Sequence, residues 1–270
     1  MRKLHGLARA AVTGSILLSA CAEGQAGASG NAASLTSLPQ GSDVVELDPA
    51  NFTTEIDNPY WPMTPGTRWT YQETDESGDE VVATVTVSSE TKETASGIVA
   101  VVVRDSVTLN GELIEDTFDW YAQDTEGNIW YLGENTAEFE ASEITTTAGS
   151  FEAGDDGAQA GIIMPANPQD GMRYRQEYYA GEAEDNGEIL STDEQAEVPL
   201  GHFTDVLLTK DTITIEPDVL EYKLYAPEIG PVLVLGVSGG AAREELIAFE
   251  TIDAEAARLA GTTPLGQDYP

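Results

Sequence analysis

Apolar and polar residues alternate at every second position over most of the chain from residue 68 onward. Val81, Ala83, Val85 and Val87 fall on one face of an extended strand, because successive side chains of a strand point to opposite faces. The same alternation predicts further strands at residues 68–73, 98–109, 112–123, 128–133, 173–179, 203–215, 220–225, 231–235 and 245–252. We therefore predict a mainly β fold with little helix, an antiparallel meander that forms a curved sheet, a sandwich or an open barrel.

Residues 141–171 interrupt this pattern with closely spaced glycines and prolines. The segment also carries the apolar run Ile162, Ile163 and Met164, which could close over a cavity. About 30 residues without a recognisable strand is long for a compact domain. The segment is therefore either a loop with a function, such as a lid, or an element that the alternation does not reveal. The first helix pattern comes later, at residues 254–259.

The N-terminus has the zones of a secretory signal. The basic residues Arg2 and Lys3 precede a short apolar run at residues 10–18, which leads into Ser19, Ala20 and Cys21. This run is too short for a bilayer-spanning helix, which needs about 20 residues. The arrangement resembles a bacterial lipoprotein signal. The resemblance implies cleavage before Cys21 and attachment of acyl chains such as palmitate to this cysteine.

Three parts of the chain follow from this signal. Residues 1–20 are the expected signal peptide, residues 21–42 the lipidated cysteine with a flexible tether, and residues 43–270 a single β-rich domain. The tether is rich in Ala, Gly, Ser, Asn and Gln, a composition typical of flexible linkers. We expect the protein in the bacterial cell envelope, outside the cytoplasm and attached to a membrane through its lipid, which is the outer membrane in a Gram-negative cell.

The composition excludes several classes of function. The chain has 12 Lys and Arg against 48 Asp and Glu, a formal net charge of −36. Such a charge excludes nucleic acids and anionic membrane surfaces as electrostatically attracted partners. One cysteine and two histidines exclude an intramolecular disulfide framework and a Cys- or His-rich metal site. Most of the carboxylates are expected to be solvated at the surface.

Asn110 and Gly111 form the residue pair best suited to a two-residue hairpin turn, in which both positions need a positive φ. If these two residues form the loop, Leu109 faces Glu112. Each step of one residue away from the loop on one strand is then matched by one step on the other strand. The same register places Asp105 directly opposite Asp116 within an otherwise apolar face.

Two facing carboxylates on a buried face repel each other, so they need compensation. They could share a proton, hold an arginine between them, or bind a hard cation such as Ca²⁺. Arg68, Arg104, Arg173 and Arg175 are the arginines set among apolar residues or on one strand face. Asp105 and Asp116 are therefore the candidate metal ligands, with the arginine pairing as the structural alternative.

Several aromatic motifs give a second resemblance. They are DNPYWP at residues 57–62 with PGT at 65–67, EDTFDWYAQD at 115–124 and GNIWY at 127–131. These motifs are similar to those of a group of secreted or lipid-anchored bacterial proteins without an assigned activity, over most of residues 57–249. The resemblance implies an extracytoplasmic location and a β-rich fold, and it supplies no catalytic residue.

The sequence leaves three hypotheses on function. The first is a binding or scaffold protein that holds a small or apolar ligand, such as a lipid, on a concave aromatic face lined by Trp61, Trp69, Trp120 and Tyr131. The second is a Ca²⁺-binding protein that uses Asp105 and Asp116. The third is a carboxylate-dependent hydrolase that uses the same pair as acid and base. The first is preferred, and no catalytic residue is assigned.

Overall fold

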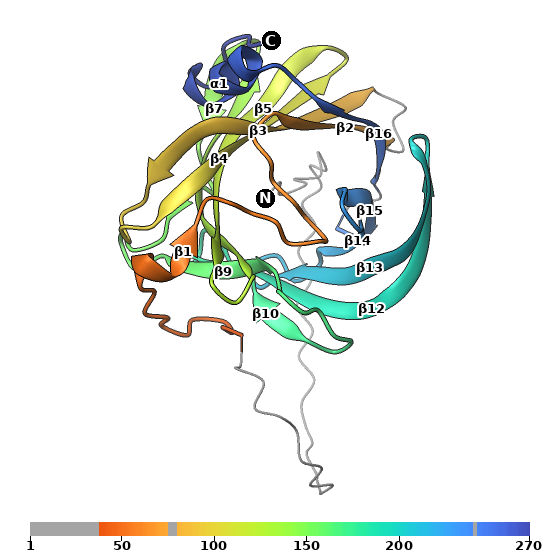
Figure 1. Cartoon of the computed structure of the whole chain (residues 1–270). Helices are drawn as coiled ribbons and strands as arrows, with labels where there is room; N and C mark the ends of the chain where they lie inside the picture. Colours follow the sequence, from red (N-terminus) through yellow and green to blue (C-terminus); the bar gives the residue numbers. More distant parts are fainter. Residues whose placement is uncertain (1–37, 75–79, 240–241) are drawn as a thin grey trace, which may run out of the picture.

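A sheet of antiparallel strands that curls into a nearly closed barrel makes up most of the structure (Figure 1). The computed structural model describes residues 38–74, 80–239 and 242–270. The predicted mainly β fold with little helix is confirmed, and among the three architectures left open the structure is the barrel. The expected signal peptide, Cys21 and most of the expected tether lie outside the described residues.

The elements have the following bounds. The strands are β1 (Phe52–Thr53), β2 (Thr67–Thr74), β3 (Val81–Glu93), β4 (Val99–Leu109), β5 (Glu112–Asp124), β6 (Ile129–Glu140), β7 (Glu143–Thr146), β8 (Phe151–Glu152), β9 (Gln159–Met164), β10 (Arg173–Arg175), β11 (Glu177–Tyr178), β12 (Asp185–Val198), β13 (Gly201–Ile213), β14 (Leu220–Ala226), β15 (Gly230–Ser238) and β16 (Arg243–Thr251). The helical elements are a short 3-10 turn, η1 (Pro49–Asn51), and the helix α1 (Ala254–Thr262).

The barrel closes through residues 173–178. Neighbouring strands pair in the order β10-β12-β13-β14-β15-β16-β2-β3-β4-β5-β6-β9-β11, so the two ends of this path are separated in the chain by Gln176 alone. The Gln176 amide donates to the carbonyl of Asp185 in β12, and the Arg175 guanidinium donates to the carbonyl of Ala160 in β9, at 2.8 and 2.7 Å. The segment therefore connects the first and last long strands of the sheet.

The N-terminal end of the described chain lies against this closure. The Arg175 amide donates to the carbonyl of Pro39 at 2.7 Å, and the Arg175 guanidinium donates to the carbonyls of Gly41 and Asp43, both at 2.7 Å. Arg175 itself is fully buried. Residues 39–43 thus contact the barrel, although the composition had placed residues up to 42 in the tether.

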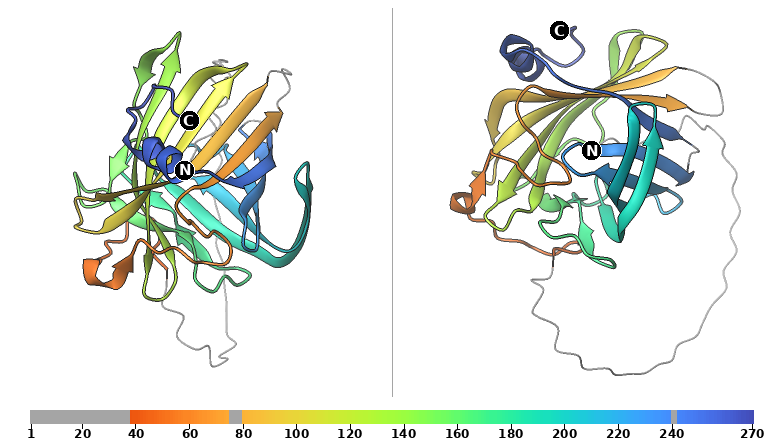
Figure 2. Two further views of the ribbon diagram at one scale, coloured as in Figure 1. Left: turned by 45° about the horizontal axis from the view of Figure 1, so that its top comes forward. Right: turned by 45° about the vertical axis from the view of Figure 1, so that its right-hand side comes forward.

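The alternation predicted for β3 is present in the structure. Val81, Ala83 and Val87 are at most 6% exposed and face the barrel interior, and Val85 borders an internal cavity. On the other face of the same strand, the helix α1 packs over the end of β3 and over β4, on the outside of the barrel (Figure 2). Strands β3 and β4 are therefore covered on both faces at this point.

The hairpin between β4 and β5 begins as predicted. Asn110 and Gly111 have φ values of 51° and 83°, as a two-residue turn of this type needs, and Leu109 pairs with Glu112. A β-bulge then changes the register: Thr108 pairs with Leu113, whereas Val107 pairs with Glu115, so that Ile114 is the extra residue.

The bulge separates the two predicted metal ligands. Asp105 pairs with Thr117, and Asp116 pairs with Ser106. A shift of one residue moves every following side chain of β5 to the other face. Asp105 consequently faces the barrel interior and Asp116 the outer face below the C-terminal segment. The prediction that Asp105 and Asp116 face each other is wrong.

Asp116 instead pairs with Arg104, one of the arginines considered from the sequence. The Arg104 side chain is fully buried, and its Nε donates to Asp116 Oδ1 at 2.9 Å. The same guanidinium donates to the carbonyl of Thr263 at 2.9 Å and lies 4.1 Å from the ring centre of Tyr269. The Gly266 amide donates to Asp116 Oδ2 at 2.8 Å. This ion pair thus fastens the C-terminal segment to the outer face of the barrel.

Residues between β1 and β2 close one end of the barrel (Figure 1). Asn58 is 3% exposed; its amide side chain donates to the carbonyls of Gly127 and Pro165, at 3.0 and 3.2 Å. The carbonyl of Pro59 accepts the Glu228 amide at 2.7 Å. The DNPYWP motif therefore connects the turns after β5, β9 and β14, which meet at this end.

Two parts of the sheet were not predicted. Residues 141–171 contain β7, β8 and β9, and Ile162, Ile163 and Met164 are fully buried in β9 within the barrel wall. They belong to a missed strand and not to a lid. Strand β12 was also missed, because its 14 residues are mostly polar and several are exposed.

We expect Asp116→Asn to lower the free energy of unfolding by about 3–5 kcal/mol, because it leaves the buried Arg104 charge without its counter-charge. Urea denaturation followed by far-UV circular dichroism measures this. Asp193→Asn is the matched control, since Asp193 is exposed and its loss changes the net charge equally. A loss for Asp116→Asn no larger than that of the control would contradict the structural role assigned to the pair.

Candidate functional site

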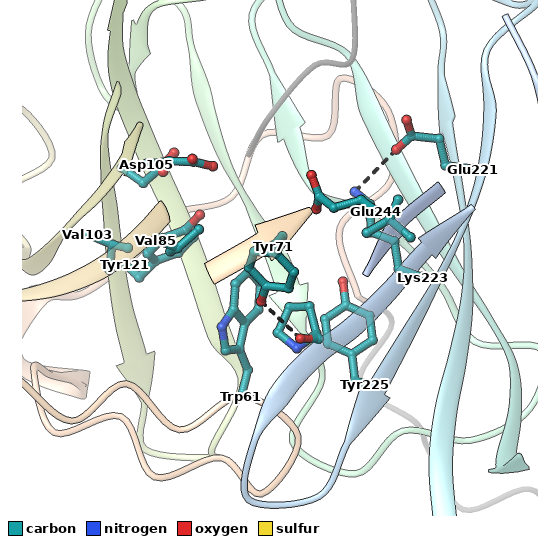
Figure 3. A pocket seen from close by; sticks show the side chains of 13 residues that line it. Trp61, Tyr71, Val85, Val103, Asp105, Tyr121, Glu221, Lys223, Tyr225 and Glu244 are labelled. Atoms are coloured by element: carbon teal, nitrogen blue, oxygen red, sulfur yellow. Dashed lines mark hydrogen bonds and ion pairs between the residues drawn. The ribbon is translucent and has the colours of Figure 1, made fainter. Parts of the chain in front are cut away.

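A cavity of about 80 Å³ lies inside the barrel and is partly open to solvent (Figure 3). Its walls come from the segment before β2 and from strands β2, β3, β4, β5, β14, β15 and β16. The aliphatic part of the lining consists of Val85, Val103, Pro231 and Val234. The other lining residues are four aromatic and five charged side chains, which is an unusual composition for the interior of a small barrel.

The aromatic lining consists of Trp61, Tyr71, Tyr121 and Tyr225. The ring centre of Trp61 lies 5.8 Å from those of both Tyr121 and Tyr225, so three rings adjoin at one end of the cavity. Gly230 permits this arrangement, since a Cβ at this position would lie 2.8 Å from the Trp61 ring. The Tyr71 hydroxyl donates to the carbonyl of Pro231 at 2.9 Å.

The tyrosines of the cavity remain neutral. Burial raises the pKa of Tyr71 well above its ordinary value, and the charges of Glu244 and Asp105 add to this. Burial followed by the charge of Asp119 does the same for the pKa of Tyr121. Neutral phenol rings keep the negative π faces that attract cations, and they add no charge of their own.

Four carboxylates and one ammonium line the cavity: Asp105, Asp119, Glu221, Glu244 and Lys223. They come from four strands, β4, β5, β14 and β16, and Figure 3 shows Asp105 of β4 and Glu221 of β14 on opposite sides. Trp61 and Tyr225 lie together at the lower end of the same view. The site thus combines an aromatic end with acidic walls.

Lys223 is held by two carboxylates. Its Nζ lies 2.9 Å from Asp211 Oδ2 and 3.6 Å from Glu221 Oε2. Burial alone would lower the pKa of Lys223, but the charges of Asp211 and Glu221 outweigh it and raise the pKa above its ordinary value. Lys223 is therefore an ammonium whose charge is already balanced by β13 and β14.

A polar network continues behind Lys223. The Gln176 side-chain amide donates to Asp211 Oδ2 at 3.2 Å, while the buried Gln176 Oε1 atom has no hydrogen-bond partner among the residues that the structure describes. The same holds for the hydroxyl of Tyr174, a fully buried residue, within this part of the chain. The closure of the barrel at Gln176 is thus connected to the charged wall of the cavity.

The four aromatic residues predicted to bind a ligand are placed differently. Trp61 lines the cavity, and Tyr131 stacks behind Tyr121 with ring centres 5.0 Å apart. Trp69 lies deeper, and its indole N–H donates to the carbonyl of Ile229 at 2.7 Å. Trp120 points to the outer face of β5, where Lys92 Nζ lies 4.4 Å from its ring centre. The structure therefore brings one of the four to the cavity surface.

The two predicted metal ligands are also separated, since Asp105 lines the cavity and Asp116 does not. In the described part of the chain, no group of three or more His, Cys, Asp or Glu residues has a geometry that could hold a metal ion. Asp105 instead belongs to the acidic wall of the cavity.

Sequence reasoning missed Tyr71, Tyr121 and Tyr225, and the charged residues of β14 and β16. In β14 the charged Glu221 and Lys223 alternate with Leu220, Tyr222 and Leu224. The expectation that apolar residues face the interior therefore assigns the wrong face of this strand to the inside of the barrel. The sequence did contain a signal for this face of β14, because opposite charges two residues apart lie on the same face of a strand and can form an ion pair there. Glu221 and Lys223 do so here.

No family model and no curated protein matches this chain. Solved structures with a similar course of the chain include a predicted lipoprotein from Parabacteroides distasonis, with 12% identity and a TM-score of 0.38 over 71% of this chain and 98% of that chain. A β-barrel-like protein of a domain of unknown function from Brucella abortus has 11% identity and a TM-score of 0.41 over 69% and 98% of the two chains. These similarities concern the general β-barrel-like course of the chain and extend no further. Within the described residues, no helix has the length and apolar character needed to cross a membrane.

The charged wall predicts a pH dependence of stability. Burial raises the pKa of Glu221 above its ordinary value, an effect that the positive charge of Lys223 only partly offsets. A carboxyl whose pKa is raised in the folded state contributes stability below its unfolded pKa and loses this contribution as the pH rises through the folded pKa. We therefore expect Glu221→Gln to reduce the loss of stability on going from pH 4 to pH 7.

Urea unfolding at a series of pH values measures this effect as the difference between variant and parent. Glu112→Gln is the matched control, because Glu112 is exposed in β5. The control curve should run parallel to that of the parent. A Glu221→Gln curve that also ran parallel would contradict a buried carboxyl in contact with Lys223.

Proposed function

We propose that the protein is an extracytoplasmic binding protein that holds a small ligand in the cavity of its barrel. The observation that carries this proposal is the cavity itself, with three adjoining rings at one end and polar groups converging from several strands. Concave sites with aromatic walls and a few placed polar groups are typical of small-ligand binding. Apart from Trp61, these side chains come from strands, which hold them more rigidly than loops would.

The volume limits the size of the ligand. Cavities for drug-sized molecules measure roughly 300–1,000 Å³. A cavity of about 80 Å³ accommodates a few water molecules or one compact chemical group. The proposed ligand is therefore small, or it is a larger molecule that inserts one small group and leaves the rest outside.

The location belongs to the same proposal. Cys21 would carry the lipid, and the residues between Cys21 and the first contact of the described chain with the barrel would serve as a tether. Their composition supports this role, since Ala, Gly and Ser dominate them. The barrel would then stand off the membrane surface with its cavity accessible to molecules outside the cytoplasm.

The hypotheses of Ca²⁺ binding and of carboxylate-dependent hydrolysis both depended on a predicted strand register that the structure does not have. Both used Asp105 and Asp116 as a facing pair, and these residues lie on opposite faces of the sheet. The Asp116 carboxylate moreover forms an ion pair with Arg104 and accepts a hydrogen bond from the Gly266 amide. Small-ligand binding is therefore the function that this site supports best.

The proposal predicts that filling the cavity abolishes binding. Val85→Phe adds a ring at the cavity surface, whereas Val82→Phe makes the same change on the opposite face of β3. We expect ligand-observed NMR with indole, cyclohexanol, benzoate and benzylamine to detect binding of at least one compound to the parent and to Val82→Phe. Val85→Phe should lose this signal while keeping the near-UV circular dichroism of the parent.

Two results would overturn the proposal. One is the absence of saturation transfer to all four compounds in the parent protein. The other is an undiminished signal in Val85→Phe, which would place the bound compound elsewhere on the protein. A molecule that co-purifies with the parent and with Val82→Phe but not with Val85→Phe, detected by mass spectrometry after denaturation, would support the proposal and identify the ligand.

A further inference from the structure

The closing segment, residues 173–178, is attached to the rest of the barrel by few strand pairs. Strand β10 pairs with β12 over three residues, and β11 pairs with β9 over two. The neighbouring strands β12 and β13, by contrast, pair over most of their length. A segment with few backbone hydrogen bonds opens at a lower free-energy cost than a long paired strand does. The closing segment is therefore a place where the barrel wall can open locally.

Residues 39–43, here called the strap, bind the backbone of this segment. The amide of Arg175 donates to the carbonyl of Pro39 at 2.7 Å, and the side-chain amide of Gln40 donates to the carbonyl of Arg173 at 2.6 Å. Pro39 is buried in this position, whereas Gln40 is exposed. The strap thus supplies backbone partners to β10 in addition to those from β12.

The Arg175 guanidinium joins the strap to the far side of the closing segment. It donates to the carbonyls of Gly41 and Asp43 in the strap and to the carbonyl of Ala160 in β9, each at 2.7 Å. A turn presents the two strap carbonyls: the Asp43 amide donates to the carbonyl of Gln40 at 2.9 Å, and Gly41 has a φ of 45°. This φ favours glycine, so the shape of the strap depends on Gly41.

The backbone of the closing segment lies directly on β9 at Gly161. A Cβ at this position would lie 2.3 Å from the carbonyl carbon and oxygen of Gln176 and 2.5 Å from the carbonyl oxygen of Arg175. Distances under 3 Å force one of the two backbones to move. The closure therefore depends on an approach so close that a single methyl group would separate the closing segment from β9.

Two successive interactions connect the closing segment with the cavity. The Gln176 side chain, next in sequence to Arg175, donates to Asp211 Oδ2 at 3.2 Å. The same Asp211 oxygen lies 2.9 Å from Lys223 Nζ, and Lys223 lines the cavity. A movement of the closing segment away from β9 would thus remove a donor from the carboxylate that holds the Lys223 ammonium.

We propose that the strap is a latch on the barrel. Bound to Arg175, it holds the closing segment on β9 and keeps the charged wall of the cavity in place; its release loosens this wall and weakens ligand binding. This inference rests on the proposed function and adds a means of regulating the same site. The strap directly continues the residues proposed as the tether, so a pull on the tether would act on the closing segment.

Acetylation of Lys223 in the full chain reports on the latch without a ligand. The Lys223 side chain is 9% exposed, whereas that of Lys210 is 36% exposed and serves as the reference within the same molecule. Acetic anhydride modifies both, and mass spectrometry of the peptides gives the ratio of the two rates. Because a buried ammonium reacts only when its surroundings open, this ratio measures how often the wall around Lys223 loosens.

Gly41→Val releases the strap without touching the closing segment, because a branched side chain is strained at a positive φ and the position has open space around it. Gly111→Val is the matched control, with a φ of 83° and the same open space in the hairpin between β4 and β5. We expect the Lys223-to-Lys210 ratio to rise about tenfold or more in Gly41→Val and to stay within about twofold in the control.

Gly161→Ala opens the closing segment from the other side, since its methyl group would meet the backbone of Gln176. Gly201→Ala is the control, because a Cβ there meets nothing within 4 Å. The first variant should raise the acetylation ratio as Gly41→Val does, and the second should leave it unchanged. Hydrogen exchange should become faster at residues 173–178 in both opened variants while β3 and β4 stay protected, which distinguishes local opening from unfolding. If Gly161→Ala does not fold, Gly41→Val decides alone.

The outcomes separate this inference from the proposed function. An unchanged ratio in Gly41→Val would overturn the latch and leave the binding function standing, and so would a rise in Gly161→Ala alone, since the segment would then move without control by the strap. A compound that binds the parent in the NMR experiment should bind Gly41→Val at least about threefold more weakly, and equal affinity would also overturn the latch. Absence of any bound compound would overturn the proposed function and with it the regulation of the site, whatever the acetylation rates are.

Discussion

Closure of the sheet at residues 173–178 is the constraint on which the rest of the structure depends. Strands β10 and β11 are two ends of one path of paired strands, yet only Gln176 separates them in the chain. Arg175 stabilises this junction by donating to backbone carbonyls from β9 and from the N-terminal end of the described chain. The curling of the sheet toward this junction creates an interior that every second residue of each strand lines.

A single extra residue decides what that interior contains. Without the bulge at Ile114, Asp116 would face inward opposite Asp105, and the barrel would hold two facing carboxylates. With the bulge, Asp105 stays inside and Asp116 turns outward to Arg104, where the ion pair and the carbonyls of the C-terminal segment satisfy both charges. The interior carboxylates and the exterior ion pair are thus two consequences of the same local change in register.

The sequence predicted the fold class and most strands, because valine-rich segments such as β3 and β4 alternate clearly, and it predicted the Asn110–Gly111 turn from its backbone requirements. It missed β12, whose polar residues lack an apolar face, and it missed β9, whose apolar run lies among glycines and prolines. Bulges leave no recognisable pattern in a single sequence, so the register beyond Thr108 was not predictable. The cavity is lined by residues from two parts of the chain, 61–121 and 221–244, and of its residues only Trp61 and Asp105 were among the candidates.

The interior charges differ in kind from those on the outside. Most carboxylates of so acidic a chain are solvated, where water and salt weaken their repulsion. Inside the barrel, desolvation makes a carboxylate costly unless a positive charge or several donors compensate it. Asp211 and Glu221 have Lys223 for this purpose, and the raised pKa of Lys223 reflects how strongly the three groups are coupled. This cluster therefore gives the barrel interior a charged wall whose cost in desolvation is offset within the fold itself.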